Sequence, residues 1–202
     1  ETLEQLPVGF DWVGEQALPA LVYPLMEPCG KQKYQIKPQA DSVLNKNNKV
    51  VKYVCGKGSE SVELPLIRYV ADADTVLIVE GTKQSHAAGL WAPSNVQVMM
   101  IAGITGWSRQ GVATPYLKAV KDKQVVIVAD ADANYNPAVY NGAEELGSWC
   151  ELHQARSVAY ARVPGQGSVG LDDVLGGLDQ EVRTGFIKKM IADARTKPAN
   201  KK

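Results

Sequence analysis

Acidic side chains follow two apolar runs of the chain. The run at residues 75–79 is followed by Glu80, and the run at residues 124–129 is followed by Asp130-Ala-Asp132. Carboxylates that converge repel one another unless a cation lies between them. A hard divalent cation such as Mg²⁺ (or Mn²⁺) takes oxygen ligands of this kind and commonly serves phosphate chemistry. These acids are therefore candidate residues of a metal site.

Both apolar runs are predicted to be buried β-strands. They are rich in β-branched residues and too short for a helix to be preferred. Neighbouring parallel strands end at one edge of a sheet, where open α/β folds bind ligands. In an extended segment, residues i and i+2 project to the same side. We therefore expect Asp130 and Asp132 to offer two oxygens to one ion, with Ala131 turned away.

Strand and helix patterns alternate from about residue 71 onward. Strands are predicted at 75–79, 96–101, 124–129 and 157–163, and helices at about 82–91, 114–121, 137–153 and 178–194. This alternation predicts an α/β fold with a mainly parallel central sheet flanked by helices. The domain is expected to cover residues 71–195, and the polar residues 196–202 are expected to form a flexible tail.

Residues 1–70 are predicted to form a small β-rich subdomain of antiparallel strands. Between residues 28 and 58 the chain has seven lysines, including Lys31, Lys33 and Lys52, and one acid. This basic segment is a candidate face for phosphate or nucleic acid. The alternative is a hairpin whose lysines keep its exposed edges soluble.

The composition is that of an ordinary globular protein, with 45% hydrophobic and 22% charged residues. No apolar stretch approaches the roughly 18 to 20 residues that a membrane span needs. Three widely spaced cysteines support neither a disulfide framework nor a zinc site, and they fit a reducing cytoplasm. The absence of an initial Met suggests a trimmed chain or a fragment of a longer protein.

The order and spacing of the acidic motifs closely resemble the Toprim domain of primases, topoisomerases and certain nucleases. That family has a Glu-Gly turn after one strand, as at Glu80, and an Asp-x-Asp after another, as at Asp130 and Asp132. The separation of about 50 residues also agrees. Asp172-Asp173 is similar to the acidic stretch that follows the last core strand in primase-type members.

The resemblance covers residues 71–195. Residues 1–70 are similar to the segment that precedes this domain in phage and plasmid replication proteins of the primase or primase-helicase kind. One departure is that many members have an acid shortly after Glu-Gly, where this chain has Lys83-Gln84.

The resemblance implies roles for the acids. Glu80 corresponds to the family's general acid or base. Asp130 and Asp132 would hold Mg²⁺ (or Mn²⁺), joined by Asp172 or Asp173. The alternative for each pair of aspartates is a plain helix N-cap, before the helix expected near residue 137 or before a short helical turn.

Basic and aromatic residues near the acids are candidates for contacts with phosphate. Lys83 lies in the first turn of the expected helix and could offset a phosphate charge. Trp107 and Arg109 could stack on and neutralise a nucleic-acid strand. The alternative is a Trp that packs against the sheet edge beside a solvated Arg.

The function implied by the resemblance is Mg²⁺-dependent phosphodiester chemistry in DNA replication, by a primase-type nucleotidyltransferase of a phage or plasmid protein. A Toprim nuclease and a non-catalytic module that binds nucleic acid or nucleotides are the alternatives. A flavodoxin-like small-molecule binder would not explain why acids follow the strands. The expected partners are DNA or RNA, nucleotides, and a helicase or zinc-binding module of a longer parent protein. No membrane partner is expected.

Overall fold

The computed structural model describes residues 20–27, 30–38, 53–55, 65–109 and 112–198. The chain divides into two compact units, Glu1–Val62 and Glu63–Lys202. Within the described residues, no helix has the length and apolar character needed to cross a membrane. The tail at residues 196–202 and the domain boundary near residue 70 stay predictions.

The first unit has antiparallel β-structure in its described part, as predicted. Strand β1 (Ala20–Met26) pairs with β2 (Gln32–Pro38), and β2 pairs with β3 (Val54–Cys55). Leu25 and Ile36 are buried, whereas the lysines of β2 are at least partly exposed. At the end of β2, the buried Ile36 and Pro38 alternate with the partly exposed Lys37.

The second unit contains a mainly parallel sheet, which confirms the predicted fold class. Its strands lie in the order β10 (Ser157–Ala161), β9 (Gln124–Val128), β5 (Thr75–Glu80), β6 (Val96–Ile101) and β4 (Leu66–Arg68). All neighbours from β10 to β6 run parallel, and β4 runs antiparallel to β6. The four parallel strands were all expected, whereas β4 has only three residues and gives no periodic signal.

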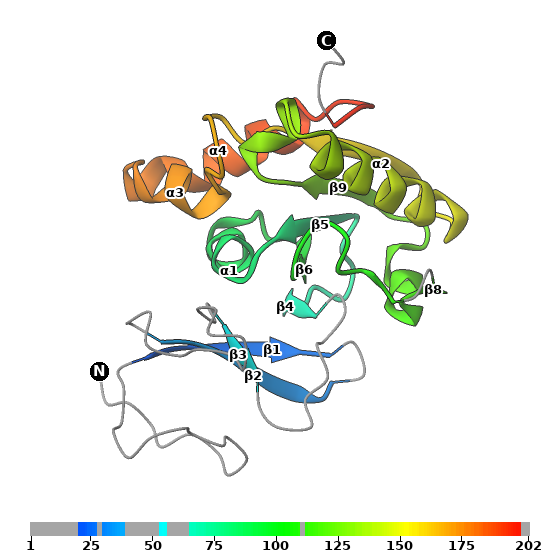
Figure 1. Ribbon diagram of the computed structural model, residues 1–202, viewed down its shortest axis with the longest axis horizontal. Helices are drawn as coiled ribbons and strands as arrows, with labels where there is room; N and C mark the ends of the chain where they lie inside the picture. Colours follow the sequence, from blue (N-terminus) through cyan, green and yellow to red (C-terminus); the bar gives the residue numbers. More distant parts are fainter. Residues whose placement is uncertain (1–19, 28–29, 39–52, 56–64, 110–111, 199–202) are drawn as a thin grey trace. The chain divides into compact units, whose positions relative to one another are not determined.

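Helices cover both faces of this sheet (Figure 1). On one face lie α1 (Thr82–Trp91), α3 (Leu171–Gly176) and α4 (Gln180–Ala192). On the other lie α2 (Pro137–Leu152) and the 3₁₀ helix η1 (Pro115–Val120). The helix predicted at 114–121 is present, but as a 3₁₀ helix of six residues and not as an α-helix.

The strands are buried on both sides, which explains their continuous apolar sequences. On β5 and β9, Leu77, Val79, Val126 and Val128 are fully buried in the cluster beneath α1, α3 and α4. The intervening residues of both strands are buried as well. A close-packed core therefore holds the ends of β5 and β9, which are adjacent parallel strands, in fixed register.

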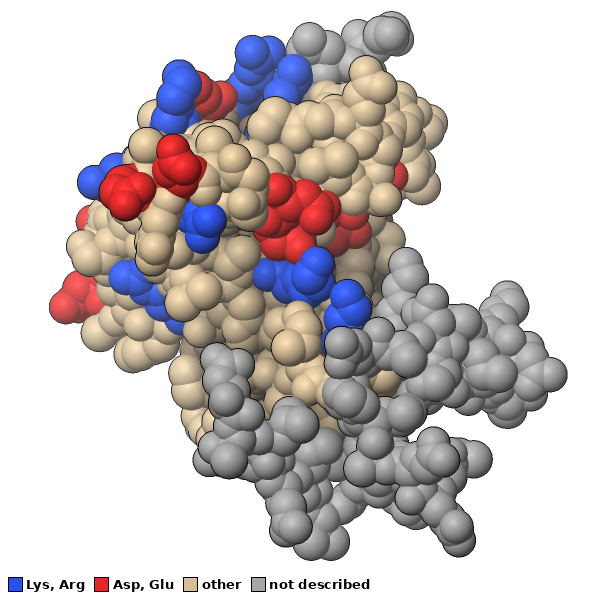
Figure 2. Space-filling model, turned by 90° about the vertical axis from the view of Figure 1, so that its left-hand side faces the viewer, with Lys and Arg blue, Asp and Glu red and all other residues tan. Residues whose placement is uncertain are grey.

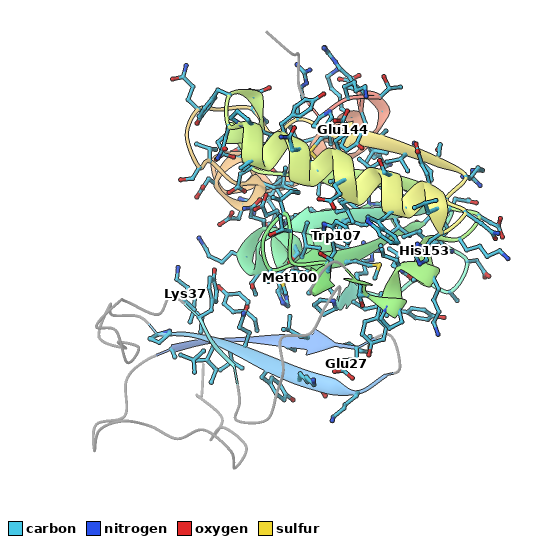
Figure 3. All side chains as sticks on the ribbon, turned by 45° about the vertical axis from the view of Figure 1, so that its right-hand side comes forward. Glu27, Lys37, Met100, Trp107, Glu144 and His153 are labelled. Atoms are coloured by element: carbon cyan, nitrogen blue, oxygen red, sulfur yellow. The ribbon has the colours of Figure 1, made fainter. Side chains whose placement is uncertain are left out.

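Trp107, in the loop after β6, packs inside the protein. Its side chain is 1% exposed, and its ring centroid lies 5.9 Å from that of Trp149 in α2. Figure 3 shows Trp107 beneath α2, in which Trp149 lies. Of the two alternatives for this residue, the structure shows the packed one. The short hairpin of β7 (Ser108–Arg109) and β8 (Val112–Ala113) follows it.

Replacing Leu77 by Ala should strongly destabilise the second unit. Leu77 is fully buried, so truncation should lower the free energy of unfolding by about 2–5 kcal/mol. Leu90→Ala is the matched control because Leu90 is 77% exposed, and its effect should stay within about 0.5 kcal/mol. Urea unfolding followed by circular dichroism measures both. Equal effects of the two substitutions would contradict this description of the core.

Cys150 should resist alkylation in the folded protein. The thiol is buried in α2, and burial raises its pKa to about 12. Because the thiolate is the reactive form, iodoacetamide at pH 8 should modify Cys150 only after urea is added. Mass spectrometry of the peptide that contains Cys150 measures this. Rapid modification without urea would show that the helix opens readily.

Candidate metal and catalytic site

Glu80 connects the loops that follow the central strands. Its Oε1 accepts a hydrogen bond from the backbone N–H of Ile104 at 3.1 Å. Its Oε2 accepts one from the backbone N–H of Asp130 at 3.4 Å. The first acidic motif thus lies directly beside the second, as the parallel strand order requires.

Gly81 allows the chain to turn from β5 into α1. Its φ of +84° lies in the left-handed region, which residues other than glycine rarely adopt. Its N–H donates to the carbonyl of Ile101 at 2.8 Å, which ties the turn to the end of β6. The N-terminal end of α1 is thereby held at the acidic edge of the sheet.

The Asp130–Asp132 segment is not extended, so that part of the sequence interpretation is wrong. Strand β9 ends at Val128, and the chain then forms the 3₁₀ helix η2 (Ala131–Asn134). Two backbone hydrogen bonds stabilise this turn, from Ala133 N–H to the Asp130 carbonyl and from Ala131 N–H to the Val169 carbonyl, each at 3.1 Å. Asp130 precedes the turn with φ −58° and ψ 158°, so helical geometry determines the presentation of Asp132 alone.

Asp132 has one carboxylate oxygen with a hydrogen-bond donor and one without. Asn136 Nδ2 donates to Oδ2 at 3.0 Å, whereas Oδ1 is buried with no hydrogen-bond partner. A buried, unsatisfied carboxylate oxygen is costly, by about 1–3 kcal/mol or more. An oxygen in this state suits a cation ligand.

The capping alternative does not account for Asp130 and Asp132. The N-cap of α2 is Asn136, whose side chain accepts a hydrogen bond from Ala138 N–H at 3.1 Å. Asp130 makes no side-chain cap to η2. Neither aspartate is needed to begin α2.

Gln84 joins the second acidic motif to the third. Its Nε2 donates to Asp130 Oδ1, and its Oε1 accepts from the backbone N–H of Leu171 at 3.1 Å. Gly170 leaves room for this contact, since a Cβ there would lie 2.6 Å from Gln84 Cδ and 2.7 Å from Asp172 Oδ1. Many members of the Toprim family have an acid shortly after Glu-Gly, and this chain has the neutral amide of Gln84 there.

The third acidic segment lies against the start of α1. Lys83 Nζ contacts Asp172 Oδ2 at 2.7 Å. Asp173 Oδ2 accepts from Gly170 N–H at 3.1 Å, so Asp173 stabilises the start of α3 as its third residue, whereas the N-cap itself is Gly170. Figure 2, seen from the side of α1 and α3, shows acidic side chains gathered in one patch with basic ones beside it.

The carboxylates are close enough to repel one another. Burial raises the pKa of Glu80, and the charges of Asp130 and Asp132 raise it further. The pKa of Asp130 is raised first by burial and then by three other aspartates, while the Gln84 hydrogen bond lowers it. Those three aspartates are Asp132, Asp172 and Asp173. A cation among them would relieve this repulsion.

The residues fit a hard cation by chemistry rather than by a preformed cage. Within the described residues, no three His, Cys, Asp or Glu side chains form a group that could hold a metal ion as they stand. The donor set is nevertheless made of carboxylate oxygens, and one of them, Asp132 Oδ1, is buried without a partner. Rotation of the Gln84 side chain would release a second, Asp130 Oδ1.

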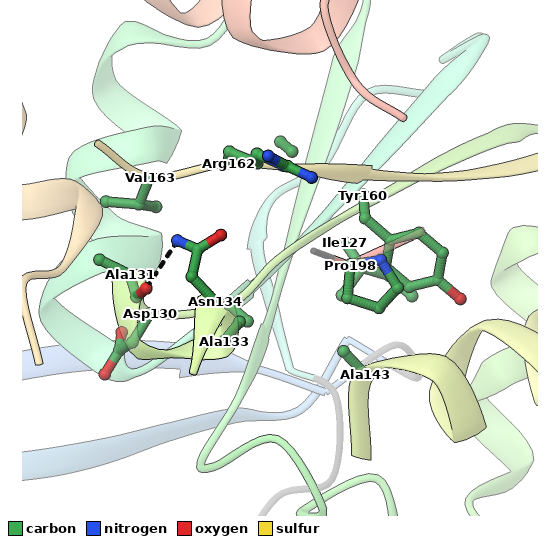
Figure 4. A pocket seen from close by; sticks show the side chains of 12 residues that line it. Ile127, Asp130, Ala131, Ala133, Asn134, Ala143, Tyr160, Arg162, Val163 and Pro198 are labelled. Atoms are coloured by element: carbon green, nitrogen blue, oxygen red, sulfur yellow. Dashed lines mark hydrogen bonds between the residues drawn. The ribbon is translucent and has the colours of Figure 1, made fainter. Parts of the chain in front are cut away.

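A small cavity lies beside the Asp130 turn (Figure 4). Its volume is about 10 Å³, close to what a single water molecule needs. Asn134 lines it and donates to the carbonyl of Ala131 at 2.9 Å. The sequence marks Gln84 only as a departure from the family and gives no signal for Asn134, whereas Asn136, directly before Pro137, is a recognisable N-cap.

The residues predicted to contact phosphate come from both units of the chain. Lys83 already pairs with Asp172. In the first unit, Lys31 is exposed and Lys33 forms an ion pair with Glu27 at 2.6 Å. Lys52 and the side chain of Arg109 lie outside what the structure describes. Their contacts with phosphate or nucleic acid stay predictions.

Comparison with known proteins supports the fold. No family model and no curated protein sequence matches the chain. Among solved structures, the DnaG catalytic core has a TM-score of 0.57 at 11% identity, over 87% of this chain and 53% of that one. The E. coli primase catalytic core gives 0.54 at 11%, over 87% and 52%.

A DnaG primase catalytic domain bound to ssDNA gives a TM-score of 0.55 at 13% identity, over 87% of this chain and 53% of that one. The chain therefore spans about half the length of these structures. At such low identity the likeness shows the fold alone. The second unit has a Toprim-like fold, as in the primase cores.

Replacing Gln84 by Leu should destabilise the protein even without metal. The substitution leaves Asp130 Oδ1 and the Leu171 N–H without their shared partner, at a cost of about 1–3 kcal/mol. Gln180→Leu is the control because Gln180 is exposed at the start of α4. Urea unfolding in EDTA compares the two. If Gln84→Leu were as mild as its control, Gln84 would not join the two motifs.

Proposed function

We propose that the chain carries out Mg²⁺-dependent nucleotidyl transfer of the primase type in DNA replication, as part of a phage or plasmid replication protein. The supporting observation is the acidic edge of the sheet. There Glu80 accepts the N–H of Asp130, Gln84 joins Asp130 to the third acidic segment, and Asp132 has a buried oxygen without a donor. This arrangement lies on a fold similar to primase catalytic cores.

Asp130 and Asp132 are the proposed ligands of Mg²⁺ (or Mn²⁺), with Asp172 or Asp173 as a further ligand. When bound, the ion would favour deprotonation of an attacking hydroxyl and offset the charge of a triphosphate. Of the third pair, Asp172 is the better candidate because its contact is a side-chain ion pair with Lys83. Asp173 instead stabilises the start of α3 by accepting a hydrogen bond from the Gly170 N–H.

The protein's own groups would position the reactants. Glu80 is the proposed general acid or base, exchanging a proton at a carboxylate oxygen. The backbone amides at the start of α1, after Gly81, would bind a phosphate group. Lys83 would move from Asp172 to a phosphate when a cation takes its place beside that carboxylate. Arg109 would contact the nucleic-acid strand.

Nucleotides and DNA or RNA are the proposed partners. One similar structure is a primase catalytic domain bound to ssDNA, which supports a nucleic-acid partner. The basic residues Lys31, Lys33 and Lys52 of the first unit would contribute contacts. A helicase or a zinc-binding module of a longer parent protein would supply further functions in the cytoplasm.

A binding module without catalysis is the second candidate. The neutral Gln84 stands where many Toprim members have an acid, and it occupies one oxygen of Asp130. A Toprim nuclease would use the same acids as a primase, so the two activities need separate assays.

The double substitution Asp130→Asn with Asp132→Asn should abolish specific metal binding. Calorimetry with Mg²⁺ and with Mn²⁺ should show saturable binding to the wild type and a loss of at least tenfold in affinity in the variant. Asp72→Asn with Asp74→Asn is the matched control, since it removes the same charge from exposed positions before β5. Equal binding by both variants would refute the metal site.

Primer synthesis and nicking assays on the same proteins separate the candidate functions. The proposal predicts metal-dependent synthesis of short products on a single-stranded template by the wild type and none by the Asp130/Asp132 variant. Nicking without synthesis would favour the nuclease. Metal binding with neither activity would favour the binding module.

A further inference from the structure

A groove lies between the end of β10 and α4, away from the residues used in the proposed function. Its volume is about 260 Å³. It is lined by Arg162, Pro164, Phe186, Lys189, Met190, Asp193 and Arg195. We refer to it as the Arg162–Arg195 groove.

The lining of the groove includes three cationic side chains, those of Arg162, Lys189 and Arg195, and one acidic side chain, that of Asp193. Lys189 and Asp193 form an ion pair at 2.8 Å and so offset each other. Both arginines line the groove, and the pKa of Arg162 is lowered first by burial and then by the charge of Arg195. Two like charges that face one cavity favour an anion between them.

The fold holds Arg195 in this place. The N–H of Tyr160 donates to the Arg195 carbonyl at 2.7 Å, and the N–H of Arg195 donates to the Tyr160 carbonyl at 3.0 Å. This short antiparallel bridge attaches the segment after α4 to the edge of β10. These backbone hydrogen bonds fix the main chain of Arg195 beside β10, and its exposed side chain extends from that fixed position.

The wall that α4 contributes includes two apolar side chains. Phe186 and Met190 come from α4, and both pack against the hydrophobic core beneath that helix. Met190 is only 6% exposed, whereas Phe186 is half-buried and keeps part of its ring at the surface. The groove thus offers a fixed aromatic and aliphatic surface beside two guanidinium groups.

We propose that the Arg162–Arg195 groove binds a nucleoside phosphate. Arginine guanidinium groups form paired hydrogen bonds with phosphate oxygens, and a base can stack on an aromatic ring such as that of Phe186. A volume of about 260 Å³ exceeds what inorganic phosphate fills and approaches the range of roughly 300–1,000 Å³ typical of small-ligand pockets. The site needs no metal and goes beyond the proposed function.

Calorimetry in EDTA tests this site without contribution from a metal-dependent one. ATP, adenosine and inorganic pyrophosphate are titrated into the full chain. ATP should bind saturably, at least tenfold more tightly than either adenosine or pyrophosphate, because only ATP uses both walls of the groove. A ten-nucleotide oligo-dT titrated in parallel distinguishes the source: tighter binding of ATP assigns a free nucleotide, and tighter binding of the oligonucleotide assigns a unit of a strand.

Arg195→Gln should weaken ATP binding at least tenfold while keeping the backbone bridge. Phe186→Leu should weaken ATP but leave pyrophosphate unchanged. Arg156→Gln is the matched control, since Arg156 is exposed and contacts Asp74 before β5. Circular dichroism confirms folding of each variant.

Three results would overturn the proposal. One is the absence of saturable ATP binding to the wild type in EDTA, and another is unchanged binding in Arg195→Gln. The third is equal affinity for ATP and pyrophosphate, which would leave a simple anion site. Loss of the Asp130/Asp132 metal site would alter none of these measurements, so the two proposals fail separately.

Discussion

The carboxylate of Glu80 is the contact on which the acidic edge depends. Standing at the end of β5, it accepts one backbone N–H from the loop after β6 and another from the loop after β9. Because β5 lies between these two strands, a single side chain holds both loops. The apolar core beneath keeps the strand ends in register, so the sheet determines the positions of the site residues.

The same edge is electrostatically unfavourable without a cation. Burial and mutual repulsion raise the pKa of Glu80 and of Asp130. The protein offsets this charge locally by giving Asp130, Asp132 and Asp172 a donor from Gln84, Asn136 and Lys83 respectively. These donors are the groups a metal ion or a phosphate would displace, which links folding of the site to ligand binding.

The sequence predicts the parallel strands and their acidic ends well, because short, continuous runs of β-branched residues followed by carboxylates are a strong signal. It does not predict how the second motif is presented, since the 3₁₀ turn at Ala131–Asn134 depends on a hydrogen bond to Val169, far along the chain. The role of Gln84 is likewise hidden, because its partners Asp130 and Leu171 meet only in the folded protein.

Paramagnetic broadening by Mn²⁺ tests the central claim, that the acidic edge is a metal site. In ¹⁵N-labelled protein, micromolar Mn²⁺ should first broaden the amide signals of Ala131, Asp132 and Leu171, at the carboxyl ends of the strands. Signals of Asp74 and Arg156, at the opposite edge, should persist. Broadening that begins at Asp74 or Arg156, or that spreads evenly over the protein, would contradict the assignment of this edge as the metal site.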